Sequence, residues 1–133
     1  MFCYESIFEI KEKRIKLMIN KEIELHRRNI CNKFKASYLE SPDQCKVGIS
    51  LNVKDNIVPI NGLRHPPQGD STGWYIWAGE YSEDTDFFKP LHVCHLKDWS
   101  DVIDQFLGLG PGWRFLIAGD YIDVWYDESL LKV

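Results

Sequence analysis

The sequence lacks any apolar run approaching the roughly 20 residues that a membrane-spanning helix needs. Its N-terminus, MFCYESIFEIKEKRIK, carries charges where a secretory signal peptide would carry its apolar core. Cysteine is also sparse, with residues only at positions 3, 31, 45 and 94. Without a secretion signal, these four cysteines are expected to be reduced thiols. The absences together predict a soluble, cytoplasmic protein with no membrane segment.

Positive charge is scarce in the second half of the chain. Residues 66–133 contain 4 Lys+Arg against 12 Asp+Glu, a net of -8, whereas residues 1–65 contain 12 against 8, a net of +4. Phosphate binding needs clustered cations, so the acidic half argues against a nucleic-acid partner. It is compatible with a basic protein partner.

A helix is predicted from Asn20, its expected cap, to Ser41-Pro42. Residues 6–19 fit either a strand or a helix, because apolar residues alternate at 15, 17 and 19 while EIKEKRIKLM is a good helix former. The predicted helix has one stripe at intervals of three and four, formed by Ile23, His26, Ile30, Phe34 and Tyr38.

Strands are predicted where apolar residues alternate, at 46–53, 73–81, 113–118 and 121–127. GWYIWAGEY has large aromatic residues on both faces, which predicts a central strand. Pro59 favours an edge position for NIVPI, and Asn61-Gly62 favours a turn. A second helix is predicted near residues 96–107, where Trp99, Val102, Ile103, Phe106 and Leu107 share a stripe.

This order of elements predicts one α+β domain over residues 1–133, with a mainly antiparallel sheet. Residues 1–45 would form its helical N-terminal part and residues 46–133 its α+β core. At 133 residues and 44% hydrophobic composition, the chain is long enough for a single core without disulfides or a metal.

The stretch PLHVCHLKDW places His92, Cys94 and His95 within four positions. A zinc site would need further ligands from His26, His65, the other cysteines or carboxylates, and none of these stands in a ligand-like pair. A nucleophilic thiol would need a base in hydrogen-bond contact, which adjacency in sequence does not supply. No catalytic residue, metal or cofactor is therefore predicted. The alternative is a small metal- or ligand-dependent enzyme that uses His65, His92, His95 and nearby carboxylates.

Two acidic clusters and one tryptophan are the candidates for a partner-binding surface. The segment SEDTDFF lacks the glycine of a calcium-binding loop. Trp125 stands between Asp123 and Asp127 at alternate positions, so its face of the strand is predicted to be wet, as for an interface anchor. Whether the clusters converge in space, or form only a solvated edge, stays open. The candidate residues are Glu83, Asp84, Asp86, Asp120, Asp123, Trp125, Asp127 and Glu128.

Three blocks, GLRHPPQGDSTGWYIWAGEY, DFFKPLHVCHL and LGLGPGWRFLIAGDYIDVWYDESLL, resemble the immunity protein thirty-three-like domains. These are small bacterial proteins assigned to the antidote side of polymorphic toxin systems. The resemblance covers about residues 46–133, and no family pattern is recognised in residues 1–45. It implies a non-enzymatic protein that neutralises a cognate toxin by binding it, and the acidic clusters suggest that this toxin is basic. The family pattern keeps both histidines around a variable position, here Cys94, which counts against a metal site that needs this thiol.

A structural module that dimerises through its aromatic surface is a third interpretation. The oligomeric state stays open at this point, as does the role of the basic N-terminal helix.

Overall fold

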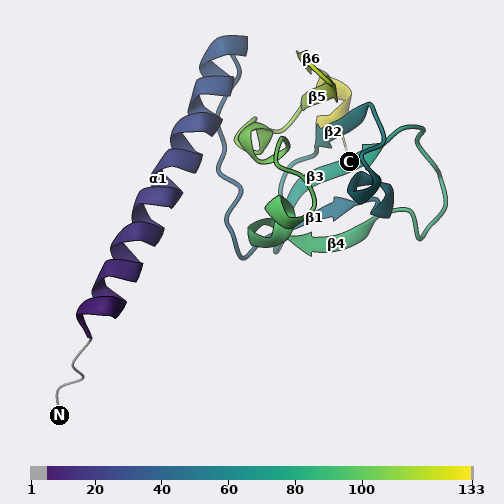
Figure 1. The fold of residues 1–133 in the computed structure, drawn as a ribbon. Helices are drawn as coiled ribbons and strands as arrows, with labels where there is room; N and C mark the ends of the chain where they lie inside the picture. The colour runs from purple at the N-terminus through teal and green to yellow at the C-terminus, as the bar shows by residue number, and fades with distance from the viewer. Residues whose placement is uncertain (1–5, 133) are drawn as a thin grey trace.

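The structure, a computed structural model, describes residues 6–132. A long helix, α1 (Ile7–Phe34), stands on one side of a sheet (Figure 1). The strands are β1 (Lys46–Ile49), β2 (Ile60–Arg64), β3 (Ser71–Ala78), β4 (Lys89–His92), β5 (Trp113–Ala118) and β6 (Tyr121–Tyr126). Short 3-10 helices connect them: η1 (Leu51–Asp55), η2 (Val93–Asp98), η3 (Asp104–Phe106) and η4 (Glu128–Leu131).

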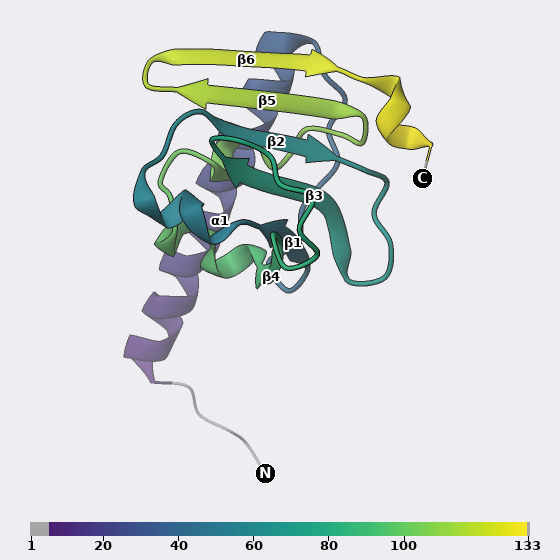
Figure 2. The same ribbon diagram turned by 90° about the vertical axis from the view of Figure 1, so that its right-hand side faces the viewer.

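The strands form one sheet in the order β4-β1-β3-β2-β5-β6. Neighbouring strands are antiparallel except β1 and β3, which are parallel. Figure 2 shows the sheet from β6 at the top to β4 at the bottom, with α1 behind it. The α+β class with a mainly antiparallel sheet is confirmed. The central position of β3 is confirmed as well.

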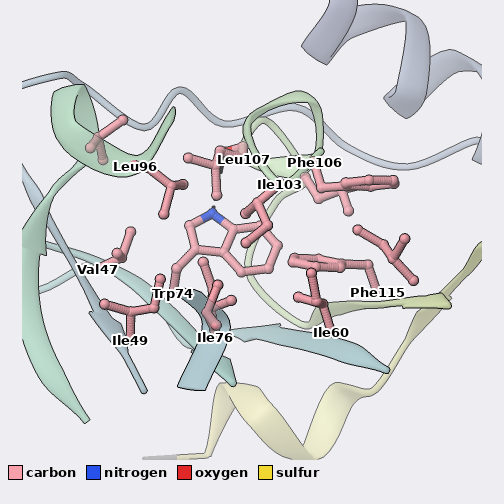
Figure 3. Packing of buried hydrophobic residues seen from close by; sticks show 14 of the residues in the cluster. Val47, Ile49, Ile60, Trp74, Ile76, Leu96, Ile103, Phe106, Leu107 and Phe115 are labelled. Atoms are coloured by element: carbon pink, nitrogen blue, oxygen red, sulfur yellow. Dashed lines mark hydrogen bonds between the residues drawn. The ribbon is translucent and has the colours of Figure 1, made fainter. Parts of the chain in front are cut away.

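The inner face of the sheet, directed toward α1, η2 and η3, carries the core. Trp74 is fully buried there, and its indole N–H donates to the Leu107 carbonyl at 3.2 Å. The Phe115 ring lies 5.4 Å from that of Trp74 and stacks on Phe106 at 4.9 Å between centroids. Aliphatic side chains surround these rings (Figure 3): Val47, Ile49, Ile60, Ile76, Leu96 and Ile103.

Helix α1 begins earlier and ends earlier than predicted. Ser6 is the cap, since its hydroxyl accepts from the Glu9 N–H at 3.1 Å and the Glu9 carboxylate accepts from the Ser6 N–H at 3.4 Å. Residues 7–19 are helical, so the open choice there is settled, and Asn20 lies inside the helix. No glycine or proline interrupts residues 7–34, which explains the single continuous helix. Lys35, in the left-handed conformation at φ 56°, ends it well before Ser41-Pro42.

The side of α1 that meets the rest of the fold also differs from the predicted stripe. His26 is exposed, and Arg27 is buried in its place. The Arg27 guanidinium donates to the Asp104 carboxylate at 2.7 Å and to the Asp104 carbonyl at 3.1 Å. An ion pair between Arg27 and Asp104 therefore links the C-terminal part of α1 to η3. The periodicity of the sequence had predicted that the neighbouring His26 would face the core instead.

Strand β2 contradicts two predictions. Pro59 precedes the strand and does not mark an edge, because β2 lies between β3 and β5. Asn61-Gly62 is no turn but the middle of β2. Gly62 is placed there because the Phe115 ring, on the neighbouring strand, lies directly over it. A glycine inside a strand commonly marks such a close approach.

Replacing Gly62 by alanine should lower the free energy of unfolding by about 1–3 kcal/mol. The new Cβ would lie 2.1 Å from Phe115 Cε2, so the ring would have to leave its stacked position. Urea unfolding measures the loss, and Asn61→Ala, on the outer face, is the matched control with a smaller effect. A second substitution, Phe115→Leu, should relieve part of the clash, so the two losses should not add. Additive losses would contradict this account of Gly62.

The predicted second helix is not formed as one element. Residues 93–106 instead contain η2 and η3, separated by a turn. The Ser100 hydroxyl accepts from the Val102 N–H at 3.3 Å, a local bond that competes with helix formation. The predicted core residues Ile103, Phe106 and Leu107 are nonetheless buried, whereas Val102 is exposed.

Arg64 is a buried cation at the end of β2. Its guanidinium donates to five backbone carbonyls, those of Leu39, Glu40, Thr72, Leu107 and Leu109, at 2.7–3.3 Å. Burial lowers the pKa of Arg64 to about 10, so the side chain stays protonated at neutral pH. It joins the sheet to the segment after α1 and to the segment after η3.

Cys31, Cys45 and Cys94 are free thiols, as predicted, while Cys3 lies outside the described residues.

Candidate functional site

The outer face of the sheet, directed away from α1, combines aromatic and apolar residues with carboxylates. Cross-strand pairing places Arg114 beside Trp125 and Leu63, and Leu116 beside Asp123. Leu63 is paired in turn with Tyr75. Residues directly opposite each other in antiparallel strands point to the same face. Asn61 is paired with both Leu116 and Trp77, so it belongs to the same face. The outer face is therefore defined by Asn61, Leu63, Tyr75, Trp77, Arg114, Leu116, Asp123 and Trp125.

The first acidic cluster lies on the β5–β6 hairpin and beyond it. Asp120 is exposed in the hairpin turn, and Asp123 is exposed on β6. Glu128 is exposed at the start of η4. Asp120 precedes β6, Asp123 lies in it and Glu128 follows it, and β6 is the edge strand at the top of Figure 2.

Trp125 lies within this cluster and is half-buried. The Arg114 guanidinium lies 5.3 Å from the Trp125 ring centroid, so one side of the indole contacts a cation of its own chain. Asp127 accepts from Arg114 at 3.4 Å and from the Ser129 hydroxyl at 2.6 Å. Asp127 thus holds Arg114 and, through it, the indole.

The charge of Asp127 is maintained by the same contacts. The hydroxyl and the backbone N–H of Ser129, and after them Arg114, hold the pKa of Asp127 below its ordinary value. Its carboxylate is therefore ionised at neutral pH but is shared with Arg114. Asp127 consequently offers a partner less free negative charge than Asp120 or Asp123.

The second acidic cluster lies in the connection from β3 to β4. Glu83, Asp84 and Asp86 are exposed there, and the Asp84 carboxylate accepts from the Asp86 N–H at 2.9 Å. Two phenylalanines at the end of the connection fasten it to the outer face. The Phe88 ring lies 5.2 Å from Tyr75 and 6.2 Å from Trp77. The Phe87 ring lies 4.9 Å from Phe88 and 5.8 Å from Tyr81.

The two clusters border the same face without touching. The connection packs on β3, and β6 is three strand positions away, a separation of about 14 Å at the usual strand spacing. The part of the outer face between the two clusters is formed by Leu63, Leu116 and Tyr75. We call this combined surface the acidic outer face. Its apolar centre and charged border have the composition of a protein-binding surface.

His65 lies apart from His92 and His95, so the histidines do not form one site. His65 is bonded through Nδ1 to the Leu130 carbonyl at 2.8 Å, and its ring meets Tyr75 edge-on at 5.6 Å. His92, Cys94 and His95 are exposed at the β4 edge, where the two imidazoles lie 6.2 Å apart. His95 Nδ1 lies 4.0 Å from an Asp98 carboxylate oxygen. Within residues 6–132, no three His, Cys, Asp or Glu side chains are grouped as a metal ion would need.

A groove of about 780 Å³ lies on the opposite side of the molecule, beside α1. Helix residues Ile15, Ile19 and Ile23 form one wall, and Val93 and Cys94 of η2 lie across from them. This groove was not predicted from the sequence. The isoleucine spacing of four was the available signal, but the choice between strand and helix for residues 6–19 obscured it.

The chain belongs to the Imm33-like domain family, whose sequence model matches residues 26–127. The match includes the whole sheet and begins inside α1, so the family pattern extends to residue 26 and not only to residue 46 as predicted. The family name indicates immunity proteins. No curated protein and no solved structure matches the chain. None of the helices within residues 6–132 has the length and apolar character needed to span a bilayer.

Proposed function

We propose that this chain is a cytoplasmic, non-enzymatic immunity protein that binds and neutralises a cognate basic toxin through its acidic outer face. The observation that carries the proposal is the match to the Imm33-like family over residues 26–127. By covering the toxin's active site or its substrate path, the bound protein would prevent the toxic reaction without performing chemistry of its own.

Two physical effects support this surface as the binding site. Carboxylates on the two borders attract a cationic partner during approach, which raises the association rate. Trp125, half-buried and held by Arg114, supplies a rigid apolar contact near one border. The proposed contact residues are Glu83, Asp84, Asp86, Asp120, Asp123, Trp125, Asp127 and Glu128.

The experiment that tests the function is capture of a partner from the native bacterium. The chain, tagged at one end, is isolated from cells, and proteins present at near-equal amounts are identified by mass spectrometry. We expect one basic protein that is released by high salt, that is toxic when expressed alone, and that is harmless when expressed with this chain. A toxin that still kills cells producing this chain in excess would refute the proposal.

Charge removal from the outer face should slow association with that toxin. The triple variant Asp120→Asn, Asp123→Asn, Glu128→Gln should lower the association rate constant about tenfold at low salt and weaken its salt dependence. A control with the same change in net charge, Glu22→Gln, Glu40→Gln, Asp101→Asn, alters exposed acids outside the outer face. Stopped-flow kinetics at several salt concentrations compares the two. Equal slowing in both variants would mean that net charge, and not this surface, steers the toxin.

A further inference from the structure

Strand β6 has one edge that pairs with nothing in the described part of the chain. It is the last strand in the order β4-β1-β3-β2-β5-β6, and within residues 6–132 no strand or isolated bridge lies on its far side. Figure 2 shows this edge at the top of the sheet. An edge strand presents a row of N–H and C=O groups that can pair with an added strand.

The register of the β5–β6 hairpin identifies the backbone groups at this edge. Ala118 and Tyr121 flank a two-residue turn, so they exchange both of their hydrogen bonds, and the exchange repeats at every second residue of β6. The Asp127 N–H, which continues this series, donates to the Gly112 carbonyl at 2.7 Å. The residues between direct their N–H and C=O groups to the free edge, and we call them the outward residues: Ile122, Val124 and Tyr126.

The two edges of the sheet differ in their protection against pairing. The opposite edge strand, β4, has only four residues, and two of these are Lys89 and Pro90. A short length, lysine and proline are the usual means of preventing edge pairing. Strand β6 has six residues in continuous register with β5 and contains no lysine, proline or glycine. The β6 edge is therefore the one that is open to an added strand.

The side chains beside the β6 edge differ between its two faces. On the inner face, Ile122 is 37% exposed and Tyr126 48% exposed, so they offer apolar contact next to the core. On the outer face, Asp123 is the charged residue of the strand. Residues 119–131 contain 4 Asp+Glu and no Lys+Arg, and the nearby Arg114 of β5 is paired with Asp127 at 3.4 Å. An added strand would thus contact apolar side chains on one face and carboxylates on the other.

A second copy of the chain does not fit this edge. If β6 paired with itself about a two-fold axis, the register that aligns all three outward residues would set Asp120 opposite Glu128. The two registers that align only two of them would set Asp123 opposite Asp123 or opposite Asp127. Like charges directly opposite each other destabilise a strand pair. The strand that fits must therefore belong to a different, basic protein.

We infer that the cognate toxin adds an extended segment to β6, antiparallel to it, so that the sheet continues into the toxin. This inference rests on the proposed function and specifies the part of the toxin that binds. The segment carries Lys or Arg at alternate positions beside Asp123, with apolar residues between them that contact Ile122 and Tyr126. Main-chain hydrogen bonds supply affinity in such an arrangement, and the alternating side chains supply specificity. Antiparallel pairing is slightly the more stable of the two kinds.

The first test uses the purified, ¹⁵N-labelled chain and a hexapeptide of alternating arginine and valine, acetylated and amidated at its ends. When about 90% of the chain is bound, exchange of the outward N–H groups with deuterium should slow about tenfold, because exchange then proceeds from the free fraction. The N–H groups that face β5 should keep their exchange rates. A hexapeptide of alternating glutamate and valine is the charge control and should not bind.

Two N-methylated forms of the basic peptide separate main-chain pairing from charge attraction. In the inferred arrangement the valines lie opposite the outward residues, so valine N–H groups donate to β6 and arginine N–H groups point away. Methylating the valine nitrogens should abolish binding, whereas methylating the arginine nitrogens should change it by no more than about threefold. The two forms have the same composition and charge. Equal effects of the two methylations, or no slowing of exchange by the unmethylated peptide, would overturn the inference.

The second test uses the captured toxin. Ile122→Pro removes an outward N–H and leaves the bonds to β5 in place, and it should weaken toxin binding about tenfold. Ile122→Ala removes the same side chain, keeps the N–H and should weaken binding no more than about threefold. Near-UV circular dichroism checks that both variants are folded. If the proline variant is not, exchange of the outward N–H groups in the wild type, with and without toxin, decides the question.

Failure of the inference and failure of the proposed function give different results. A toxin that binds both Ile122 variants equally, or that leaves the exchange of the outward N–H groups unchanged, contradicts pairing at β6 and leaves the immunity function intact. If the chain does not protect cells from any toxin, the proposed function fails, whereas the peptide experiments judge the β6 edge without a toxin.

Discussion

Replacing Arg64 by methionine should lower the free energy of unfolding by about 3–5 kcal/mol. The guanidinium donates to carbonyls in three separate segments: Leu39 and Glu40 after α1, Thr72 in β3, and Leu107 and Leu109 after η3. Without the cation, these acceptors lose a donor, and each buried carbonyl without a partner costs about 1–3 kcal/mol.

The burial of the charge offsets part of this loss. Burial lowers the pKa of Arg64 to about 10, which corresponds to a desolvation cost of about 3 kcal/mol that methionine would not bear. The hydrogen bonds from the charged guanidinium to these carbonyls outweigh that cost, so the net effect of the substitution is a loss of stability. Since the arginine is protonated in both the folded and the unfolded chain below about pH 9, the loss should be constant between about pH 6 and pH 8.

Urea unfolding of the wild type, Arg64→Met, Arg64→Lys and Arg28→Met measures these effects. Lysine keeps the charge but has three donors in place of five, so its loss should be intermediate. Arg28 is exposed, pairs with Glu24 at 3.1 Å and lies over Tyr38, so its replacement should cost no more than about 1 kcal/mol. A loss below 1 kcal/mol for Arg64→Met would show that the three segments are held together by other contacts.

Arg64 also shows why part of the fold could not be predicted from the sequence. The alternation Ile60, Gly62, Arg64 follows the inner face of β2, yet Asn61-Gly62 has the composition of a turn and Pro59 that of an edge strand. The glycine is explained by a ring on another strand, and the arginine by carbonyls 8 to 45 residues away in sequence. Neither partner is visible in a local pattern.

In the strands that were predicted correctly, the local sequence by itself indicates the structure. In WRFLIA and YIDVWY, β-branched and aromatic residues alternate around a Gly119-Asp120 turn, and the structure has β5 and β6 as neighbours. In GWYIWAGEY, both faces are aromatic because the core packs on one and Phe88 packs on part of the other, where Tyr75 stays 37% exposed. Local chemistry and tertiary contacts agree in these segments, which makes them predictable.

The residues of the candidate site could be predicted from the sequence, but their arrangement on one surface could not. The exposure of Asp120 follows from its place in the hairpin turn, and that of Asp123 from the alternation of β6. That the β3–β4 connection lies over the same face depends on strand order, because β3 and β6 are brought to one sheet by β2 and β5 between them. The pairing of Asp127 with Arg114 across the hairpin likewise depends on the register of β5 and β6.

Trp125→Ala should weaken binding of the toxin by about 30-fold to 1,000-fold, or 2–4 kcal/mol, if the acidic outer face is the interface. The indole supplies a large apolar area at little entropic cost, because Arg114 and, behind it, Asp127 already restrict its position. The effect should fall on the dissociation rate, whereas charge removal falls on the association rate. Surface plasmon resonance with the captured toxin separates the two rates.

The matched comparison is Tyr81→Ala, because Tyr81 is an exposed aromatic residue, 57% accessible, beside the second acidic cluster. If the toxin covers both acidic clusters and the surface between them, Tyr81→Ala should also accelerate dissociation, though less than Trp125→Ala. An effect of Tyr81→Ala alone would indicate an interface nearer to β3 and β4. No effect of either substitution would indicate an interface away from the outer face.

Asp127→Asn tests whether Asp127 acts through Arg114 and the indole. The substitution should weaken binding chiefly by releasing Arg114, so its effect should largely disappear in the Trp125→Ala background.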